Sequence, residues 1–296
     1  MSCRATRRPT IDGLLLADKP AGVTSHDVVA IARRAYGERR IGHGGTLDPF
    51  ATGLLVLLVG RATRLLPYLD GEPKVYDATI RFGVETDTDD ITGQPVRSAA
   101  LPTRDAVERA IASLTGRLEQ QPPAYSAKKL GGRKAYDAAR RGAALALAPA
   151  PVTVHAWEIR HWRENDAGAE LDATITCASG TYIRALARDL GRLTSSAAHL
   201  TALRRVASGP FHVSDALSLD AIRAAAASPR PALHAVPSLP VERLDAADAG
   251  RVRRGQRVGA SLEAPRAALV DQSGALVAIG ERQGGEWQPR VVLGDE

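Results

Sequence analysis

Apolar and polar positions along this chain follow patterns that predict both strands and helices. The strongest signal is an unbroken apolar run at residues 54–59, bounded by glycines, which is typical of a fully buried strand. A shorter run at residues 13–17 predicts another strand, followed by a turn at residues 18–22. Apolar residues then recur at helical spacing from Ser25, the predicted N-cap, to Gly37, which ends the helix.

The middle of the chain combines half-buried strands with two further helices. Residues 75–82 and 170–177 alternate, so every second side chain faces a core, and residues 152–160 predict a third strand. Helical spacing covers residues 103–116 and resumes after a Ser-Gly-Thr turn until Gly191. We expect the alternating strands to pair antiparallel, with one face buried.

The last quarter of the chain has a different character. Prolines between residues 228 and 240 mark a linker or a domain boundary. Beyond it, short segments at residues 267–271, 275–281 and 290–293 suggest a small β-barrel. Because 296 residues are enough for about two domains, we expect the proline-rich stretch to separate them. Residues 1–10 predict a disordered basic arm.

The net charge of +6 is unevenly distributed. One cluster comprises Lys128, Lys129, Arg133, Lys134, Arg140 and Arg141, and a second comprises Arg251, Arg253, Arg254 and Arg257. Clustered positive charge is the footprint expected for a polyanion, most often nucleic acid. A solvated basic surface is the alternative for either cluster alone.

Several classes of protein are disfavoured by the composition. The longest run of large apolar residues is far short of the ~20 needed to span a bilayer, so we expect no membrane association and a cytoplasmic protein. The two cysteines form no disulfide framework, and the seven histidines form no ligand-like cluster. We therefore expect no metal. No phosphate-binding glycine motif accompanies the loop at residues 42–45, which excludes a nucleotide-binding enzyme of that kind.

The most functional stretch is the glycine-bent loop at residues 41–53, which carries His43 and Asp48 as its strongly functional side chains. A carboxylate held on such a loop beside a buried strand has the fixed geometry that a nucleophile or general base needs. The alternative is that Asp48 and Pro49 simply initiate a turn.

Other candidate residues also allow two interpretations. One interpretation of Lys19 is that it binds a phosphate or a carboxylate, and the other is that it is an ordinary turn residue. Tyr76 stacks on a base or fills the core. Arg184, in the first turn of a helix, opposes the helix dipole and is best explained by an anionic partner, although a solvent-facing arginine is the alternative. The acidic loop at residues 86–90 could bind a divalent cation, but it lacks a distal glutamate.

An ordered set of motifs closely resembles the TruB family of bacterial tRNA pseudouridine-55 synthases. The motifs are D-K-P at residues 18–20, G-H-G-G-T-L-D-P-F-A-T-G at residues 42–53, Y-S-A-K-K at residues 125–129 and G-T-Y-I-R at residues 180–184. The sequence departs from the usual pattern at Gly44, where family members often have threonine. The resemblance covers residue 12 to about residue 205.

This resemblance implies an α+β catalytic domain at residues 11–236, with a pseudouridine synthase fold built on a mixed, mainly antiparallel sheet. It also implies a small PUA-like RNA-binding β-barrel at residues 237–296, where the match is poorer. By analogy, Asp48 is the catalytic carboxylate and Arg184 is its partner. His43, Tyr76, Tyr182 and Leu203 match positions that contact the target nucleotide, and Lys19 matches a position near the active site.

The implied reaction converts uridine 55 in the T loop of tRNA into pseudouridine without a cofactor. One carboxylate suffices, either by attacking the nucleotide or by removing a sugar proton to give a glycal, and the sequence leaves both routes open. The base must leave its stack, which costs a few kcal/mol, and stacking on Tyr76 could return ~1–3 kcal/mol.

The expected partner is the T stem-loop of tRNA, and we expect a monomer that needs no protein partner. A non-catalytic RNA-binding or RNA-folding protein is the alternative, although the intact set of Asp48, Tyr76 and Arg184 argues against it. Guide-RNA-dependent relatives share the catalytic motifs but carry long additional tails, which we do not expect here.

Overall fold

The computed structural model describes residues 11–123, 129–130, 133–134, 148–165 and 168–293. The predicted basic arm at residues 1–10 lies outside the described residues, as does most of the basic segment that begins at Lys128.

A mixed sheet forms the framework of the described chain. Its ten strands follow the order β14-β1-β3-β12-β4-β11-β10-β7, with β2 paired to β3 and β13 paired to β12. The strands are β1 (Gly13–Lys19), β2 (Ile41–His43), β3 (Thr52–Val59), β4 (Lys74–Phe82), β7 (Gly116–Gln120), β10 (Ala150–Asn165), β11 (Gly168–Cys177), β12 (Ala198–Ser208), β13 (Phe211–His212) and β14 (Leu217–Ser218). Only β1–β14 and β3–β12 pair in parallel among these strands. The prediction of a mixed, mainly antiparallel sheet is confirmed.

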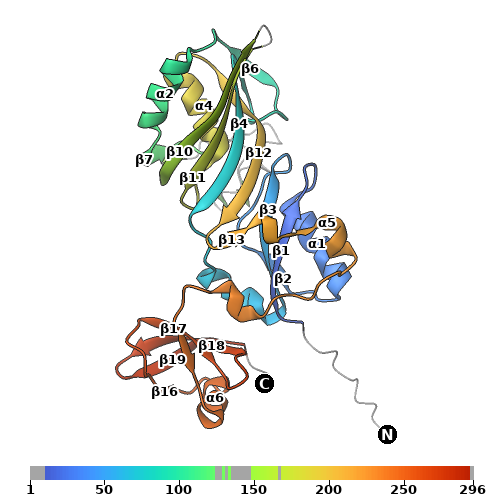
Figure 1. The fold of residues 1–296 in the computed structure, drawn as a ribbon, viewed down its shortest axis with the longest axis vertical. Coiled ribbons are helices and arrows are strands. Elements are labelled where there is room, and N and C mark those ends of the chain that lie inside the picture. The colour runs from blue at the N-terminus through green and yellow to red at the C-terminus, as the bar shows by residue number, and fades with distance from the viewer. Residues whose placement is uncertain (1–10, 124–128, 131–132, 135–147, 166–167, 294–296) are drawn as a thin grey trace.

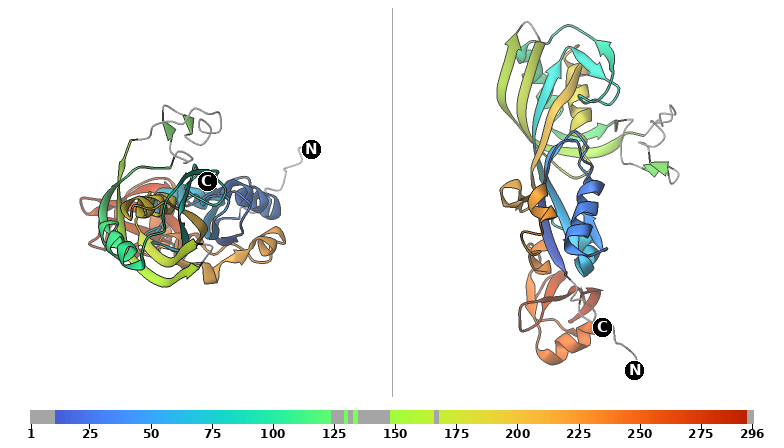
Figure 2. Two further views of the ribbon diagram at one scale, coloured as in Figure 1. Left: turned by 90° about the horizontal axis from the view of Figure 1, so that it is seen from above. Right: turned by 90° about the vertical axis from the view of Figure 1, so that its right-hand side faces the viewer.

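The described chain also contains five α-helices, three 3₁₀ turns and two short hairpins outside the main sheet. The helices are α1 (Ser25–Tyr36), α2 (Arg104–Ser113), α4 (Ile183–Leu193), α5 (Leu219–Arg223) and α6 (Ala246–Arg253), with 3₁₀ turns η1 (Gly60–Tyr68), η2 (Val213–Asp215) and η3 (Ala232–Ala235). Two hairpins are formed by β5 (Val84–Thr86) with β6 (Pro95–Ser98) and by β8 (Lys129–Leu130) with β9 (Arg133–Lys134). The β8–β9 hairpin stands away from the body of the molecule in both views of Figure 2.

Three predicted helix boundaries are wrong. The helix predicted to close at Gly116 ends at Ser113, and Gly116 begins β7. The N-cap of α1 is Thr24, whose side chain accepts a hydrogen bond from the Asp27 amide, whereas Ser25 is buried and bonds to Leu47. Helix α4 continues past Gly191 to Leu193. Gly191 serves close packing instead, because a Cβ there would lie 2.5 Å from the Ala198 nitrogen.

The molecule is elongated, and three regions follow one another along its long axis (Figure 1). One end holds the long strands β4, β10, β11 and β12 with α2 and α4, and the centre holds β1, β2 and β3 with α1 and α5. The predicted alternation of the strand at residues 75–82 is confirmed, because Tyr76, Ala78, Ile80 and Phe82 are all buried in the core shared with α2 and α4.

The other end is a five-stranded sheet in the order β15-β17-β18-β19-β16. Its strands are β15 (Val241–Arg243), β16 (Val258–Gly259), β17 (Arg266–Val270), β18 (Leu276–Gln283) and β19 (Glu286–Val292). Within the described residues the order is an open path from β15 to β16, so the sheet is a curled half-barrel. The expected small β-barrel is confirmed to that extent, and its PUA-like character stays a prediction.

The proline-rich stretch is ordered and packed rather than a free linker. Leu14 and Arg230 exchange backbone hydrogen bonds of 2.9 and 2.8 Å, which fixes this stretch against β1. One apolar core includes Leu14 and Val56 of the main sheet and Val270 and Ile279 of the C-terminal sheet. The two sheets therefore share a core. None of the described helices is long and apolar enough to cross a membrane.

Candidate active site

The loop that carries Asp48 is fixed at both of its ends. The Gly44 amide donates to the Val56 carbonyl on β3 at 2.9 Å, and the Ala51 amide donates to the Asp48 carbonyl at 3.1 Å. The buried side chain of Leu47 anchors the loop between these points. Asp48 and Pro49 do initiate a turn, and this turn holds the Asp48 carboxylate, which is 34% exposed, at a defined position.

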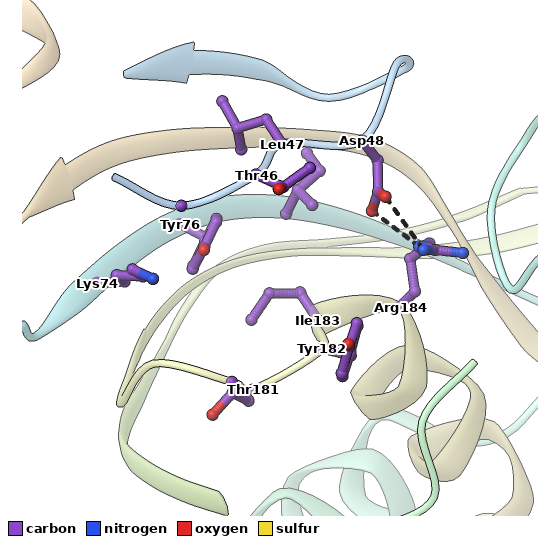
Figure 3. Close-up of a pocket in the computed structure, with 12 residues that line it drawn as sticks. Thr46, Leu47, Asp48, Lys74, Tyr76, Thr181, Tyr182, Ile183 and Arg184 are labelled. Carbon is purple, nitrogen blue, oxygen red and sulfur yellow. Dashed lines mark hydrogen bonds and ion pairs between the residues drawn. The ribbon is translucent and has the colours of Figure 1, made fainter. Parts of the chain in front are cut away.

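Arg184 binds this carboxylate as a fork. Its Nε donates to Asp48 Oδ2 at 2.9 Å and its Nη2 donates to Oδ1 at 3.1 Å (Figure 3). The Arg184 side chain is only 4% exposed, so the solvent-facing alternative is wrong. Its Nη1 also donates to the Thr88 carbonyl at 2.8 Å and lies 3.6 Å from Asp90. Bidentate pairing fixes the direction of a carboxylate as well as compensating its charge.

Asp48 and Arg184 face a pocket of about 270 Å³. Of the predicted site residues, the structure brings five together in its lining: Asp48, Tyr76, Tyr182, Arg184 and Leu203. The remaining lining residues are Gly45, Thr46, Leu47, Lys74, Gly180, Thr181 and Ile183. The pocket thus lies between the Asp48 loop, β4, β12 and the start of α4 (Figure 3).

The two tyrosines of the pocket are held in different ways. Tyr76 projects from β4 opposite Arg205 of β12 and is 7% exposed, and this burial raises the pKa of Tyr76. Tyr182 is the N-cap residue of α4. Its amide donates to Gln120 Oε1 at 2.9 Å, and its carbonyl accepts from Gln120 Nε2 at 3.0 Å. This amide clamp from β7 fixes the backbone at the start of α4.

Lys19 and His43 are not in the pocket lining. Lys19 is fully buried, and its ammonium donates to the carbonyls of Pro20, Val23 and Pro49. It therefore holds the turn after Asp48 in place; burial lowers the pKa of Lys19 to about 8. His43 ends β2, two residues before Gly45 of the lining. Burial and the neighbouring Arg205 lower the pKa of His43 below its ordinary value.

The acidic loop contributes to the site in a way that the sequence did not predict. Asp89 and Asp90 are buried beside the arginines of α4. The signal for this contact is the spacing of Arg184, Arg188 and Arg192, which places three cations on one helix face. In the described part of the chain, no group of His, Cys, Asp and Glu side chains is arranged to hold a metal ion.

Comparison with solved structures identifies the fold. A chain in "Structure of H/ACA RNP bound to a substrate RNA containing 2'-deoxyuridine" superimposes with a TM-score of 0.70 at 20% identity, covering 99% of this chain and 93% of that one. A chain in "Crystal Structure of a Cbf5-Nop10-Gar1 Complex" gives 0.69 at 23% identity, covering 95% and 84%. At this level of identity, the likeness concerns the fold.

Comparison of sequences defines the class, which is that of the pseudouridylate synthases. Residues 33–183 match the model "TruB family pseudouridylate synthase (N terminal domain)", and residues 184–243 match "tRNA pseudouridylate synthase B C-terminal domain". The tRNA pseudouridine synthase B of Thermobifida fusca is 46% identical over 95% of this chain and 98% of its own length. That of an Arthrobacter strain is 43% identical over 96% and 97%. The chain belongs to the TruB family.

Proposed function

We propose that this protein is a tRNA pseudouridine synthase that isomerises uridine 55 in the T loop, with Asp48 as its catalytic carboxylate. The observation that carries the proposal is the forked ion pair between Asp48 and the buried Arg184, which faces a pocket also lined by Tyr76. Membership of the TruB family supplies the reaction and the substrate, because the curated relatives are tRNA pseudouridine synthases B.

The reaction exchanges one bond to the ribose for another. The C1′–N1 bond breaks, the uracil ring turns within the pocket, and C5 bonds to C1′ and releases its proton. Asp48 begins the reaction either by bonding to C1′ or by removing the C2′ proton. Reactants and product are isomers, so no oxidant or group donor is needed. Because the pocket is inside the protein, the target nucleotide enters it only after leaving the RNA stack.

The other lining residues hold the everted nucleotide. The ring of Tyr76 offers a stacking surface, which is worth ~1–3 kcal/mol per base in comparable sites. Tyr182 and Leu203 close the pocket around the sugar and base. His43 contacts the target nucleotide from the loop that leads to the pocket, and Lys19 supports the active site through the Pro49 carbonyl.

The C-terminal sheet at residues 237–296 serves as a PUA-like RNA-binding module beside a catalytic domain at residues 11–236. Two exposed cations support this role, because Arg243 and Arg254 have no acidic partner within the described residues. Their contacts would be with phosphates, which set position rather than sequence. The protein acts as a cytoplasmic monomer without a protein partner.

A T-arm minihelix incubated with the purified protein tests this proposal. Pseudouridine is mapped by a derivatisation that adds mass to pseudouridine but not to uridine, and RNA binding is measured by fluorescence anisotropy. Asp48→Asn should abolish conversion while binding survives. Asp105→Asn, which removes an exposed acid in the first turn of α2, should leave both unchanged. Full conversion by the Asp48→Asn variant would exclude the proposed role.

A further inference from the structure

Lys74 occupies the end of the pocket away from Asp48 (Figure 3). It begins β4, two residues before Tyr76, so both side chains leave the strand on the same face. Its Nζ lies 3.3 Å from the point where a Gly45 Cβ would stand, and Arg205 Nη1 lies 3.5 Å from the same point. The missing side chain of Gly45 therefore leaves room for cationic groups at this end of the pocket.

The charge of Lys74 is uncompensated at close range. Asp48 is already paired with Arg184, and Arg205 donates to the carbonyls of Leu54 and Gly45. Across the described ranges, no carboxylate lies within 4.0 Å of the Lys74 ammonium and no acceptor is hydrogen-bonded to it. Glu72, the nearby acid, accepts from the Ser179 amide at 2.8 Å. This end of the pocket is therefore positively charged.

An ammonium without an acceptor raises the free energy of the pocket when no ligand occupies it. Lys74 is half-buried, and this burial together with the neighbouring Arg205 lowers the pKa of its ammonium. A cation removed from water without an acceptor raises the free energy of a site. An anionic or strongly accepting group that enters the pocket would relieve this cost, and the proposed reaction generates one there.

Both routes open to Asp48 create the same anion. When the C1′–N1 bond breaks, its electron pair leaves with uracil, and the negative charge spreads over N1, O2, O4 and C5. The uracil anion must stay in the pocket and turn until C5 faces C1′. C5 then supplies the electron pair of the new bond and loses its proton. Asp48 and Arg184, committed to the sugar, cannot also balance this charge.

We propose that Lys74 is a further catalytic residue, whose ammonium stabilises the uracil anion while it is detached from the ribose. The inference rests on the proposed function and adds a role to it. Fixed positive charge aimed at a group where charge develops is commonly the largest contribution to catalysis. A lysine ammonium offers three donors on a four-carbon stem, so it can bond to a uracil oxygen in more than one orientation of the ring.

The test compares Lys74→Met with Lys74→Arg in single-turnover conversion of the T-arm minihelix. Removing one such charge should lower the saturated rate about 10²–10³-fold, with RNA affinity within threefold of wild type. Lys74→Arg should recover most of the rate. Arg39→Met is the control, because it makes the same change in net charge. Arg39 is exposed and is not in the pocket lining, so this variant should keep the wild-type rate. If the Lys74→Met variant melts at a lower temperature than wild type, Lys74→Gln takes its place in the comparison.

A second substrate separates charge stabilisation from a structural role. A minihelix with 5-fluorouridine at the target carries a less basic leaving base, so its departure needs less help from Lys74. Followed as loss of the fluorinated nucleoside, the deficit of Lys74→Met should shrink at least tenfold. An equal deficit on both substrates would overturn the inference. So would an unchanged saturated rate with weaker, less salt-dependent binding, which would assign Lys74 to a phosphate. A wild-type protein inactive on the plain minihelix would count against the proposed function instead.

Discussion

Arg188 Nη1 donates a hydrogen bond of 3.1 Å to the carboxylate of Asp89, and both side chains are buried. On one side of this pair, Arg184 of α4 lies near Asp90 of the same acidic loop. On the other side, Arg192 of α4 pairs with Glu85 of β5, the strand that leads into the loop. The contacts hold the loop whose Thr88 carbonyl accepts from Arg184. These contacts therefore help to fix the orientation of Arg184, and through it that of the proposed catalytic pair.

The two members of the Arg188–Asp89 pair should differ greatly in the cost of their removal. Arg188→Met leaves a buried carboxylate without its closest cation, which typically costs about 3–5 kcal/mol. Asp89→Asn should cost much less, because Arg188 keeps Asp189 at 2.9 Å and the Gln121 carbonyl at 2.8 Å as acceptors. Chemical denaturation of both variants measures the difference. Equal losses of unfolding free energy would contradict this asymmetry.

The same pair predicts a pH dependence of stability. Burial raises the pKa of Asp89 to about 6, above its ordinary value of 3.8. The folded protein therefore binds this proton more tightly than the unfolded chain, and the stability that Asp89 contributes is greatest below pH 4 and is lost as the pH rises to about 6. A difference of about two pH units corresponds to about 3 kcal/mol. The Asp89→Asn variant lacks this titrating group. The difference in unfolding free energy between wild type and variant should therefore change by about 3 kcal/mol between pH 4 and pH 7.

Gly53 and Gly22 form a matched pair for testing the packing behind the Asp48 loop. Both have positive φ angles, of 99° and 84°. A Cβ on Gly53 would lie 2.3 Å from the Arg205 carbonyl oxygen, whereas one on Gly22 would meet nothing within 4 Å. Gly22→Ala should cost about 1 kcal/mol from backbone strain alone. Gly53→Ala should cost several times more and separate β3 from β12, which thermal denaturation would show. Similar melting temperatures would refute the close approach.

Local sequence patterns predicted the secondary structure well, because the spacing of apolar residues along a strand or helix determines which of its side chains are buried. The alternating faces of β4 and β11 and the buried run of β3 follow directly from that link. The contact between Asp48 and Arg184 spans 136 residues. No local pattern encodes such a distance, and the expectation of this pair came from the family motifs.

The predictions that failed depended on tertiary partners. The role of Lys19 near the active site stays a prediction, although no local pattern indicated that its ammonium would donate to the Pro49 carbonyl, thirty residues away. Gly191 looked like the end of α4, but the helix runs on to Leu193, and the glycine is where Ala198 approaches the helix closely. The acidic loop was a plausible cation site until α4 placed arginines opposite its carboxylates. In each case the missing information was which distant group approaches.

Arg184→Lys should separate charge from geometry in the active site. Lysine keeps the positive charge but loses the fork that holds both Asp48 oxygens and the Thr88 carbonyl. We expect the saturated rate of pseudouridine formation to fall about 10²-fold or more, as misplacement of a catalytic group often does, with RNA affinity nearly unchanged. Arg160→Lys, which alters an exposed arginine paired with Glu158, is the control. A wild-type rate in Arg184→Lys would mean that charge alone suffices.

The shared core predicts that the two sheets do not fold independently. Leu14 and Val56 of the main sheet lie in one cluster with Val270 and Ile279 of the C-terminal sheet, and Arg64 Nη1 donates to the Val292 carbonyl at 2.7 Å. Deleting residues 237–296 would uncover this apolar surface. We expect the truncated chain to aggregate or to melt well below the full-length protein, in size-exclusion chromatography and calorimetry.

A point substitution in the full chain tests the same coupling without a deletion. Ile279→Ala should cost about 2–5 kcal/mol, as truncation of a buried isoleucine generally does. Because Ile279 belongs to the core that also contains strands β1 and β3, we expect a single unfolding transition that moves as a whole. Arg64→Ala removes one exposed hydrogen bond across the same boundary and should change little. Two separate transitions, with only one of them shifted in Ile279→Ala, would show that the sheets are independent domains after all.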